Sequence, residues 1–99
     1  MLERELEARL IRRVKSAGGL CFKWNSPGNA GVPDRIVLLP GGRVIFVEIK
    51  RPKGGRLSRL QKWWAKKLID LGFAYDCIWD EQDLQLFVET ELGGGQNEF

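Results

Sequence analysis

The chain has 99 residues, of which 43% are hydrophobic and 29% charged, with a formal net charge of +3, and this composition suits one compact domain with a buried core. It contains no histidine, and its two cysteines, Cys21 and Cys77, show no Cys-x-x-Cys spacing. These absences exclude zinc fingers, Ser-His-Asp triads and histidine acid–base chemistry. Catalysis would therefore have to use carboxylates, lysine or a metal bound by oxygen atoms. No stretch approaches the roughly 20 apolar residues of a membrane span, and the charged N-terminus is unlike a signal peptide, so we expect a cytoplasmic protein.

The first predicted element is a helix from Leu2 to Lys15, which the glycine pair Gly18-Gly19 ends. Its apolar residues recur at helical spacing and form one arc of the helix surface: Leu2, Leu6, Leu10 and Val14. Glu3 and Glu7 lie inside or beside this arc. Two acids near a buried side need an explanation, and both a salt bridge to a neighbouring arginine and a role in a site remain open.

The middle of the chain reads as β-structure. A short strand over Leu20 to Trp24 is followed by a loop over Asn25 to Pro33, which is rich in glycine and proline. Two further strands, Asp34 to Leu39 and Arg43 to Lys50, flank Pro40-Gly41-Gly42, which predicts a hairpin. Both faces of this hairpin carry apolar residues, so we expect an α/β layered core with helices covering the sheet.

The hairpin predicts a pair of facing carboxylates. If Pro40 to Gly42 form a three-residue loop, Leu39 lies opposite Arg43, and Asp34 then lies opposite Glu48. Like charges in that position are destabilising unless a cation lies between them, and magnesium typically binds one or two carboxylates together with waters. Lys50 faces the same side. Two alternatives stay open: Lys50 could neutralise the two acids in a purely structural cluster, and another loop length would shift the register.

The C-terminal half predicts a helix, a strand and a second helix. After a basic loop over Arg51 to Arg56, one helix face holds Leu57, Leu60, Trp64, Leu68 and Leu71, and Gly72 ends the helix. A strand over Phe73 to Trp79 follows. Asp80 is placed to cap a last helix whose apolar face holds Leu84, Phe87, Val88 and Leu92. We therefore expect one domain over residues 1–92 and a flexible tail over 93–99.

Charge is distributed unevenly along the chain. The segment from Lys50 to Lys67 carries eight basic residues and no acid, whereas Asp70 to Phe99 carries eight acids and no basic residue. This asymmetry favours one surface that binds a polyanion such as nucleic acid. The alternative is a basic helix that is simply solvated.

Several segments of the sequence together resemble a known nuclease family. Pro33-Asp34 followed by Glu48-Ile49-Lys50 is similar to the signature of the PD-(D/E)XK nucleases. The surrounding segments narrow the resemblance, namely Gly31-Val32-Pro33-Asp34-Arg35, Gly41-Gly42, Phe46 to Pro52 and Leu57-Ser58-Arg59-Leu60-Gln61. Their order and spacing, over about Glu3 to Val88, resemble the virus-type replication-repair nuclease (VRR-NUC) domain in its stand-alone phage form.

This resemblance implies a restriction-endonuclease-like fold, with an α-β-β-β-α-β core and a central mixed sheet flanked by helices. It also implies a Mg²⁺- or Mn²⁺-dependent endodeoxyribonuclease in which Asp34, Glu48 and the main-chain carbonyl of Ile49 bind the metal. Lys50 would orient the attacking water and help to neutralise the transition state. A first-helix acid completes the set, and counting about eleven residues back from Gly18 gives Glu7 rather than Glu3, as a further ligand directly or through a water.

Other residues have two interpretations each. Gln61 is a family position that would touch the site, but Ser58-x-x-Gln61 is also a capping box. Lys23 could bind the scissile phosphate or face solvent. Trp64 and Trp79 suit the core, whereas Trp63 lies off the apolar face and could contact DNA or a second copy. Positioning contacts to the DNA backbone are expected from Arg51, Lys53, Arg56, Arg59, Lys62 and Lys66.

By analogy with stand-alone members of the family, we expect a structure-selective nuclease for branched DNA, acting as a homodimer that resolves four-way (Holliday) junctions. The alternatives are a flap-type nuclease on the same fold and a branched-DNA-binding module that does not cleave. A sequence-specific endonuclease is disfavoured because no long insertion is available for reading the major groove. A phage protein of this kind would act in the cytoplasm of its bacterial host.

Overall fold

A computed structural model describes residues 2–50 and 55–93. The predictions for Arg51, Lys53 and the tail from residue 94 onward lie outside these residues. The elements, in chain order, are α1 (Glu3–Ser16), β1 (Leu20–Lys23), β2 (Arg35–Leu39), β3 (Arg43–Ile49), α2 (Arg59–Asp70), β4 (Ala74–Ile78) and α3 (Glu81–Glu91). No helix in the described part of the chain is long and apolar enough to span a membrane.

The four strands form one mixed sheet in the order β1-β2-β3-β4. β1, β2 and β3 pair in antiparallel fashion, while β4 pairs with β3 in parallel, because the α2 crossover returns the chain to the same end of the sheet before β4 begins. The order α-β-β-β-α-β, followed by α3, is the predicted restriction-endonuclease-like architecture, and the prediction of its fold class is confirmed.

The hairpin of β2 and β3 has the predicted register. Leu39 pairs with Arg43 and Arg35 pairs with Val47, which is the register of a three-residue loop. Gly41 and Gly42 have φ angles of 84° and 78°, a backbone conformation that residues with a side chain rarely adopt. The glycine pair therefore fixes the loop length, and the loop length fixes which residues face each other at the far end.

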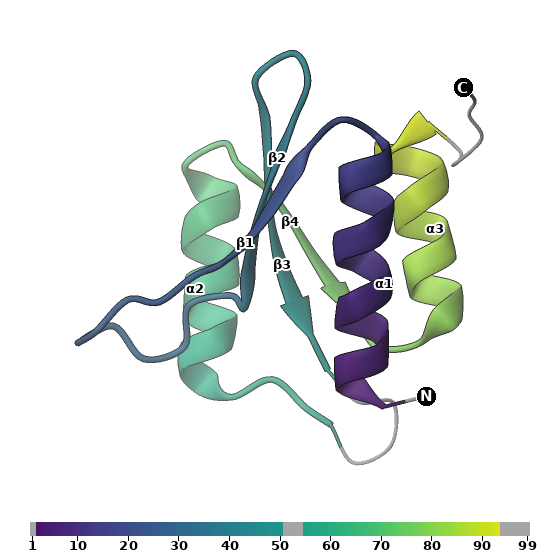
Figure 1. Cartoon of the computed structure of the whole chain (residues 1–99). Coiled ribbons are helices and arrows are strands. Elements are labelled where there is room, and N and C mark those ends of the chain that lie inside the picture. The colour runs from purple at the N-terminus through teal and green to yellow at the C-terminus, as the bar shows by residue number, and fades with distance from the viewer. Residues whose placement is uncertain (1, 51–54, 94–99) are drawn as a thin grey trace.

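One face of the sheet forms the core. Helices α1 and α3 lie side by side over it (Figure 1). The side chains that these two helices contribute to the core are fully or nearly fully buried, namely Leu6, Leu10, Val14, Leu84, Phe87 and Val88. The sheet contributes alternate residues of β2 and β3, namely Val37, Leu39, Ile45, Val47 and Ile49. The predicted apolar faces of the first and last helices are confirmed, except that Leu2 caps α1 and is 55% exposed.

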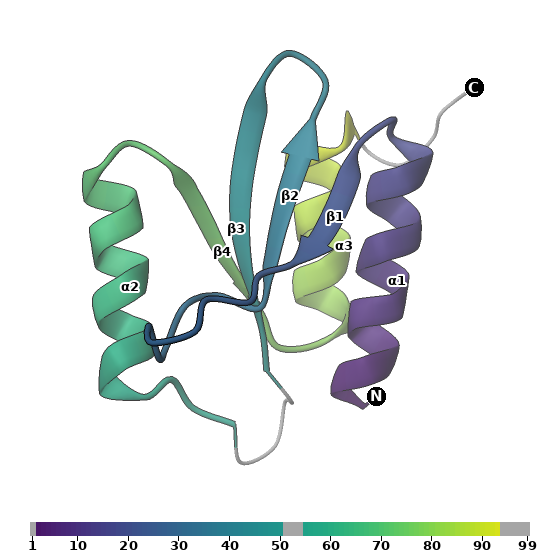
Figure 2. The ribbon, with the colours of Figure 1, turned by 60° about the vertical axis from the view of Figure 1, so that its left-hand side comes forward.

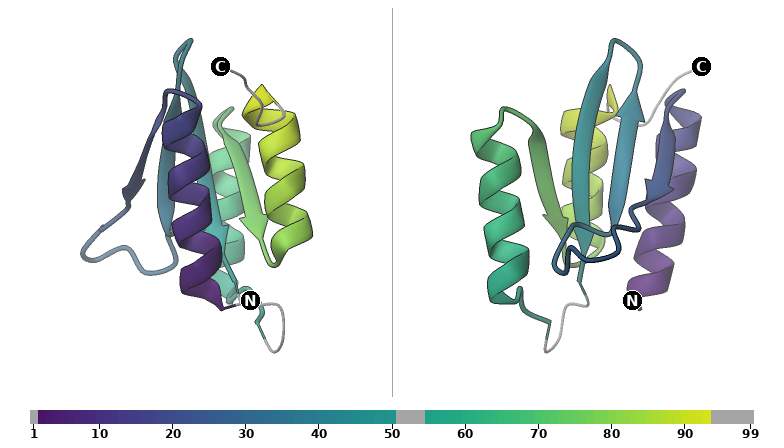
Figure 3. Two further views of the ribbon diagram at one scale, coloured as in Figure 1. Left: turned by 45° about the vertical axis from the view of Figure 1, so that its right-hand side comes forward. Right: turned by 90° about the vertical axis from the view of Figure 1, so that its left-hand side faces the viewer.

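Helix α2 flanks the sheet on the opposite face, as predicted, but it covers only part of that face. Helix α2 packs against β4 at one edge (Figure 3), and only Leu68 of its predicted apolar face is buried. Leu60 and Leu71 are more than half exposed. On the uncovered half, Leu20 and Phe22 of β1 are also exposed, because no element lies over them in the described structure.

The chain brings three segments to one end of the sheet. The C-terminal end of β3, the first turn of α1 and the first turn of α2 all lie there (Figure 1). The loop between β1 and β2 reaches across to α2 (Figure 2), where Gly31, with a φ of 93°, lies so close to Leu60 that a Cβ atom would clash with it. This close approach fixes the loop against α2 three residues before Asp34, whose carbonyl accepts a hydrogen bond of 2.9 Å from the Trp24 amide.

Candidate active site

Asp34 and Glu48 lie together at this end of the sheet. Asp34 immediately precedes β2, and its Oδ2 accepts a hydrogen bond of 2.8 Å from the backbone amide of Ile49. Glu48, the residue before Ile49 in β3, is 2% exposed and is the one buried charged residue in the described structure. The two carboxylates predicted from the hairpin are therefore adjacent, and one of them is almost out of contact with solvent.

The electrostatics of Glu48 reflect this arrangement. The pKa of Glu48 is raised from 4.5 to about 8, chiefly by burial and then by the neighbouring charge of Asp34 and a hydrogen bond with it. The charge of Lys50 opposes the shift, whereas that of Glu3 adds to it. Without a bound cation, the pair therefore holds a proton at neutral pH. A divalent cation could replace that proton and let both acids ionise.

The residues present fit a magnesium-type ion. Two carboxylates with open coordination positions for water and phosphate oxygens are a usual protein contribution to Mg²⁺ binding. The described residues contain no cluster of three or more Asp, Glu, His or Cys residues that could hold a metal, so Asp34 and Glu48 would bind the ion with help from the backbone or from water. The acidic pair, one member of which has a raised pKa, is compatible with a bound cation.

Lys50 follows β3 directly and is half-buried. Its backbone amide donates to the carbonyl of Ile78 at 2.9 Å, which extends the pairing of β3 with β4 by one residue. Its positive charge lowers the pKa of Glu48, so the ammonium group acts electrostatically on the carboxylate pair. The structure thus brings Asp34, Glu48 and Lys50 together as the alternation of the strand predicts.

Gln61 satisfies both of its predicted interpretations. Its backbone amide donates to the Ser58 Oγ and its Oε1 accepts from the Ser58 amide, which completes the capping box at the start of α2. Its Nε2 donates to Glu48 Oε2 at 3.1 Å. The cap therefore holds the Gln61 side chain in place, and the other end of the same amide group orients the buried carboxylate.

Gln61→Ala is expected to lower cleavage about 10- to 100-fold, the usual effect of removing a residue that orients a metal ligand. It also removes the hydrogen bond from the Ser58 amide to Gln61 Oε1, which is one half of the capping box, so Ser58→Ala, which removes the other half, is the matched control, with an expected loss of about 1 kcal/mol of stability. Urea unfolding and cleavage rates measured on both variants separate the two roles. Equal losses of activity in the two variants would mean that the contact with Glu48 has no separate role.

The two candidate acids of α1 occupy different surroundings. Glu7 forms an ion pair of 2.7 Å with Arg35 of β2, so its carboxylate is directed at the guanidinium group of the residue that follows Asp34 in the chain. Glu3 lies one turn nearer the N-terminus, and its charge raises the pKa of Glu48. Helical spacing alone placed both acids near the buried arc and did not distinguish these positions.

The basic residues predicted to contact DNA lie on the surface. Lys23, Arg56, Arg59 and Lys62 are exposed. Lys66 pairs with Asp70 at 2.7 Å, an exposed contact within α2, where ion pairs contribute little to stability. Arg59 and Lys62 lie in the first turn of the helix that carries Gln61, so the described basic surface of α2 begins next to the carboxylate pair.

Two residues next to the site escaped prediction from the sequence. Cys77 of β4 pairs in register with Glu48, and Tyr75 lies on the same face two residues earlier. Burial is the main reason that the pKa of both groups is raised, and the charge of Glu48 also contributes; the pKa of Cys77 is about 12. Both groups therefore stay neutral, so the side chains of β4 next to Glu48 carry no charge. The alternation of β4 was readable in the sequence, but its parallel register with β3 was not.

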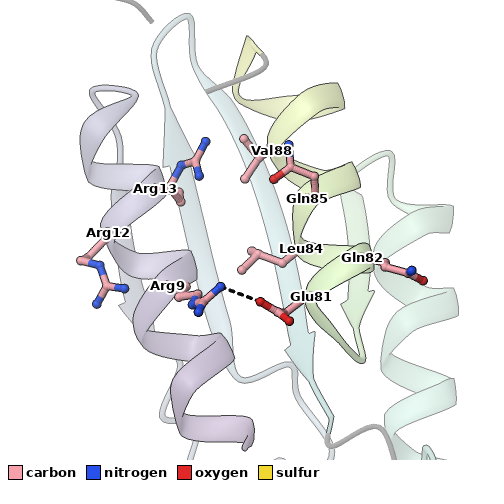
Figure 4. Close-up of a pocket in the computed structure, with 8 residues that line it drawn as sticks. All are labelled: Arg9, Arg12, Arg13, Glu81, Gln82, Leu84, Gln85 and Val88. Atoms are coloured by element: carbon pink, nitrogen blue, oxygen red, sulfur yellow. Dashed lines mark hydrogen bonds and ion pairs between the residues drawn. The ribbon is translucent and has the colours of Figure 1, made fainter. Parts of the chain in front are cut away.

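A separate groove lies between α1 and α3. It has a volume of about 520 Å³ and is lined by Arg9, Arg12, Arg13, Glu81, Gln82, Leu84, Gln85 and Val88 (Figure 4). An exposed ion pair of 2.8 Å between Arg9 and Glu81 bridges it. All of its lining residues belong to the two helices that cover the core face, so this groove does not contain the carboxylate pair.

Known proteins resemble this chain in sequence and in structure. No protein-family model matches it. The chain is 42% identical over 82 residues to a protein of Acyrthosiphon pisum secondary endosymbiont phage 1 described as "Putative nuclease p44", a match that covers 83% of this chain and 86% of that protein. A solved structure described as "VRR_NUC domain" matches with a TM-score of 0.84 and 24% identity, over 90% of this chain and 96% of that one. The chain therefore belongs to the family of the phage protein described as "Putative nuclease p44", and it has the fold of a VRR_NUC domain.

Proposed function

We propose that this protein is a Mg²⁺- or Mn²⁺-dependent endonuclease that hydrolyses phosphodiester bonds in DNA. The observation that carries the proposal is the Asp34–Glu48 pair, in which a 2% exposed glutamate lies against a second acid and has a pKa of about 8. Such a pair is unfavourable without a cation. The family relationship supports nuclease chemistry as its use.

Each residue of the site has a separate task in this proposal. A bound Mg²⁺ or Mn²⁺ would favour ionisation of the attacking water and reduce the negative charge on the phosphoryl oxygens. Asp34 and Glu48 would hold the ion together with the carbonyl of Ile49, and the Ile49 amide fixes Asp34 by its 2.8 Å hydrogen bond. The Lys50 ammonium would orient the water and offset the charge that develops on the phosphate.

The basic surface would position the DNA. Arg56, Arg59 and Lys62 are exposed on or before the first turn of α2, and contacts of such groups with phosphates give affinity that does not depend on sequence. Lys23 would contact the strand that is cut, and Arg51 and Lys53, which lie outside the described residues, would add further phosphate contacts.

Branched DNA is the substrate class that we propose, with a homodimer cutting four-way junctions. Each chain carries a single Asp34–Glu48 pair, and symmetric resolution of a junction requires two opposed cuts, which a two-fold dimer supplies. We place this activity in the cytoplasm of a bacterial host, in keeping with the phage origin of the relative.

The proposal is tested by incubating the purified protein with Mg²⁺ and three labelled DNAs: a four-way junction, a flap and a linear duplex. Symmetric nicks in the junction that EDTA suppresses are expected. Preferential cutting of the flap would assign the chain to flap-type nucleases, and a stable uncut complex with Mg²⁺ present would indicate a binding module instead.

For the acid of α1, the influence of Glu3 on the pKa of Glu48 supports Glu3, whereas the ion pair with Arg35 supports a structural role for Glu7. Glu3→Gln is therefore expected to lower cleavage about 10- to 100-fold with little change in stability. Glu7→Gln leaves the Arg35 side chain, which is 16% exposed, without its counter-ion and should cost about 1–3 kcal/mol of stability. Cleavage rates and urea unfolding measured on both variants check these expectations. A larger loss of cleavage in Glu7→Gln than in Glu3→Gln would mean that Glu7 is the acid of α1 that acts at the site.

A further inference from the structure

Trp63 presents a large aromatic side chain to solvent in the middle of α2. It is 54% exposed, although tryptophan is among the side chains that gain most from burial. It lies off the side of the helix that contacts the sheet, where only Leu68 is fully buried. Packing within the chain therefore does not account for much of the indole surface.

The exposed indole contacts a row of further aromatic rings. Its ring lies 5.2 Å from that of Trp64, nearly perpendicular to it at 87°. Trp64 is itself fixed, since its Nε1 donates to the carbonyl of Ala30 at 3.1 Å and its ring contacts Trp24 at 5.9 Å. Trp24 in turn packs 5.1 Å from Phe46 of β3, two residues before Glu48. A chain of rings thus connects the exposed indole to the strand that carries the site.

Positive charges surround this indole. Arg59, Lys66 and Lys67 lie four residues before, three after and four after Trp63, so they are its neighbours on the helix surface, and all three are exposed. Lys66 is paired with Asp70, whereas Arg59 and Lys67 have no ion pair among the described residues. Exposed aromatic rings together with cations are the components of surfaces that bind single-stranded nucleic acid, where bases stack on the rings and phosphates contact the cations.

Trp63 lies a short distance along α2 from the residue that contacts the Asp34–Glu48 pair. Gln61, which donates to Glu48, is two residues earlier, about 3 Å along the helix axis and on the other side of a helix about 10 Å wide. A DNA strand whose scissile phosphate lies at Asp34 and Glu48 could therefore reach Trp63 within a few nucleotides, since nucleotides in one strand are spaced by about 3.4 Å.

We propose that Trp63 forms a stacking site for an unpaired nucleobase, with Arg59 and Lys67 holding the adjacent phosphates. This inference rests on the proposed nuclease function and specifies its substrate: DNA in which bases near the cut are unpaired. A paired base has no free face for the indole, so the site distinguishes branched or single-stranded regions from a continuous duplex.

The test compares the binding of two DNAs in EDTA, a perfect duplex and the same duplex with a single-stranded arm. Trp63→Ala is expected to weaken binding to the DNA with the arm about 5- to 150-fold and to leave binding to the perfect duplex unchanged. Trp63→Phe should retain most of the affinity. Phe22→Ala is the matched control, because Phe22 is 48% exposed on β1, and it should change neither. Equal weakening on both DNAs, or none on either, would overturn the proposal.

Two further measurements separate stacking from other causes. Lys67→Ala should weaken binding and flatten its salt dependence, whereas Trp63→Ala should leave the salt dependence unchanged. Sedimentation should give the same mass for wild type and Trp63→Ala; a smaller mass for the variant would mean that Trp63 joins copies of the chain, against this inference. If the wild type cuts no DNA, the proposed function fails. If it cuts and Trp63→Ala keeps the same preference for the arm, only the stacking site fails.

Discussion

Glu48→Gln is expected to lower cleavage at least about 1,000-fold and, in the absence of divalent metal, to make the protein more stable above pH 5. The loss of activity follows because the amide removes one of two negative charges that would hold the metal, and the metal supplies several kcal/mol of transition-state stabilisation. The gain in stability follows because the amide of glutamine cannot ionise next to Asp34. The amide also has the same shape as the carboxylate and lies at the same position near Gln61.

The pH dependence has a definite sign. Because folding raises the pKa of Glu48 from 4.5 to about 8, the folded state binds a proton that the unfolded state has released between these values. The contribution of Glu48 to the free energy of unfolding is therefore complete below pH 4.5. It is lost, by about 1.4 kcal/mol per pH unit, as the pH rises to about 8.

Urea unfolding in EDTA at pH 5 and pH 8 measures this effect. The wild type should lose stability between the two values by more than Glu48→Gln does. Glu89→Gln, a change at an exposed position of α3, is the matched control and should behave like the wild type. A wild type and Glu48→Gln with the same pH dependence would contradict the arrangement described for the carboxylate pair.

Lys50→Ala is expected to lower cleavage about 100- to 10,000-fold, the range for a group that assists proton transfer or stabilises developing charge. Binding of the DNA should change little, because affinity comes chiefly from the many surface cations. The charge of the ammonium lowers the pKa of Glu48 because it disfavours a bound proton, and it disfavours a bound divalent cation in the same way, so its removal should lower the Mg²⁺ concentration needed for half-maximal activity.

Single-turnover cleavage and DNA binding, each measured over a series of Mg²⁺ concentrations, check this expectation. Lys15→Ala, which removes an exposed lysine near the end of α1, is the control and should leave the rate unchanged. A loss of binding in proportion to the loss of cleavage would make Lys50 a DNA contact and not a participant in the chemistry.

The centre of the site was predictable because it depends on local chemistry. Gly41 and Gly42 specify a three-residue turn, the turn specifies the register, and the register brings Asp34 to Glu48 and fixes the side on which Lys50 lies. Helix caps are equally local, so Ser58 and Gln61 could be recognised as a capping box from four consecutive residues.

Long-range packing limited the rest of the prediction. The helical wheel places Glu3 and Glu7 on one side of α1 but does not show that Arg35 pairs with Glu7. The parallel register that sets Cys77 beside Glu48 depends on how the α2 crossover packs. The contact between Gln61 and Glu48 likewise depends on the placement of α2 over the sheet, so the capping box alone could not decide whether Gln61 reaches the site.

The most direct test of the cation site is a crystal structure grown with Mn²⁺ at pH 8.5, where a proton no longer competes effectively for Glu48. An anomalous difference peak is expected within direct coordination distance of carboxylate oxygens from both Asp34 and Glu48. No peak between these two acids, or a peak bound elsewhere on the chain, would contradict the account.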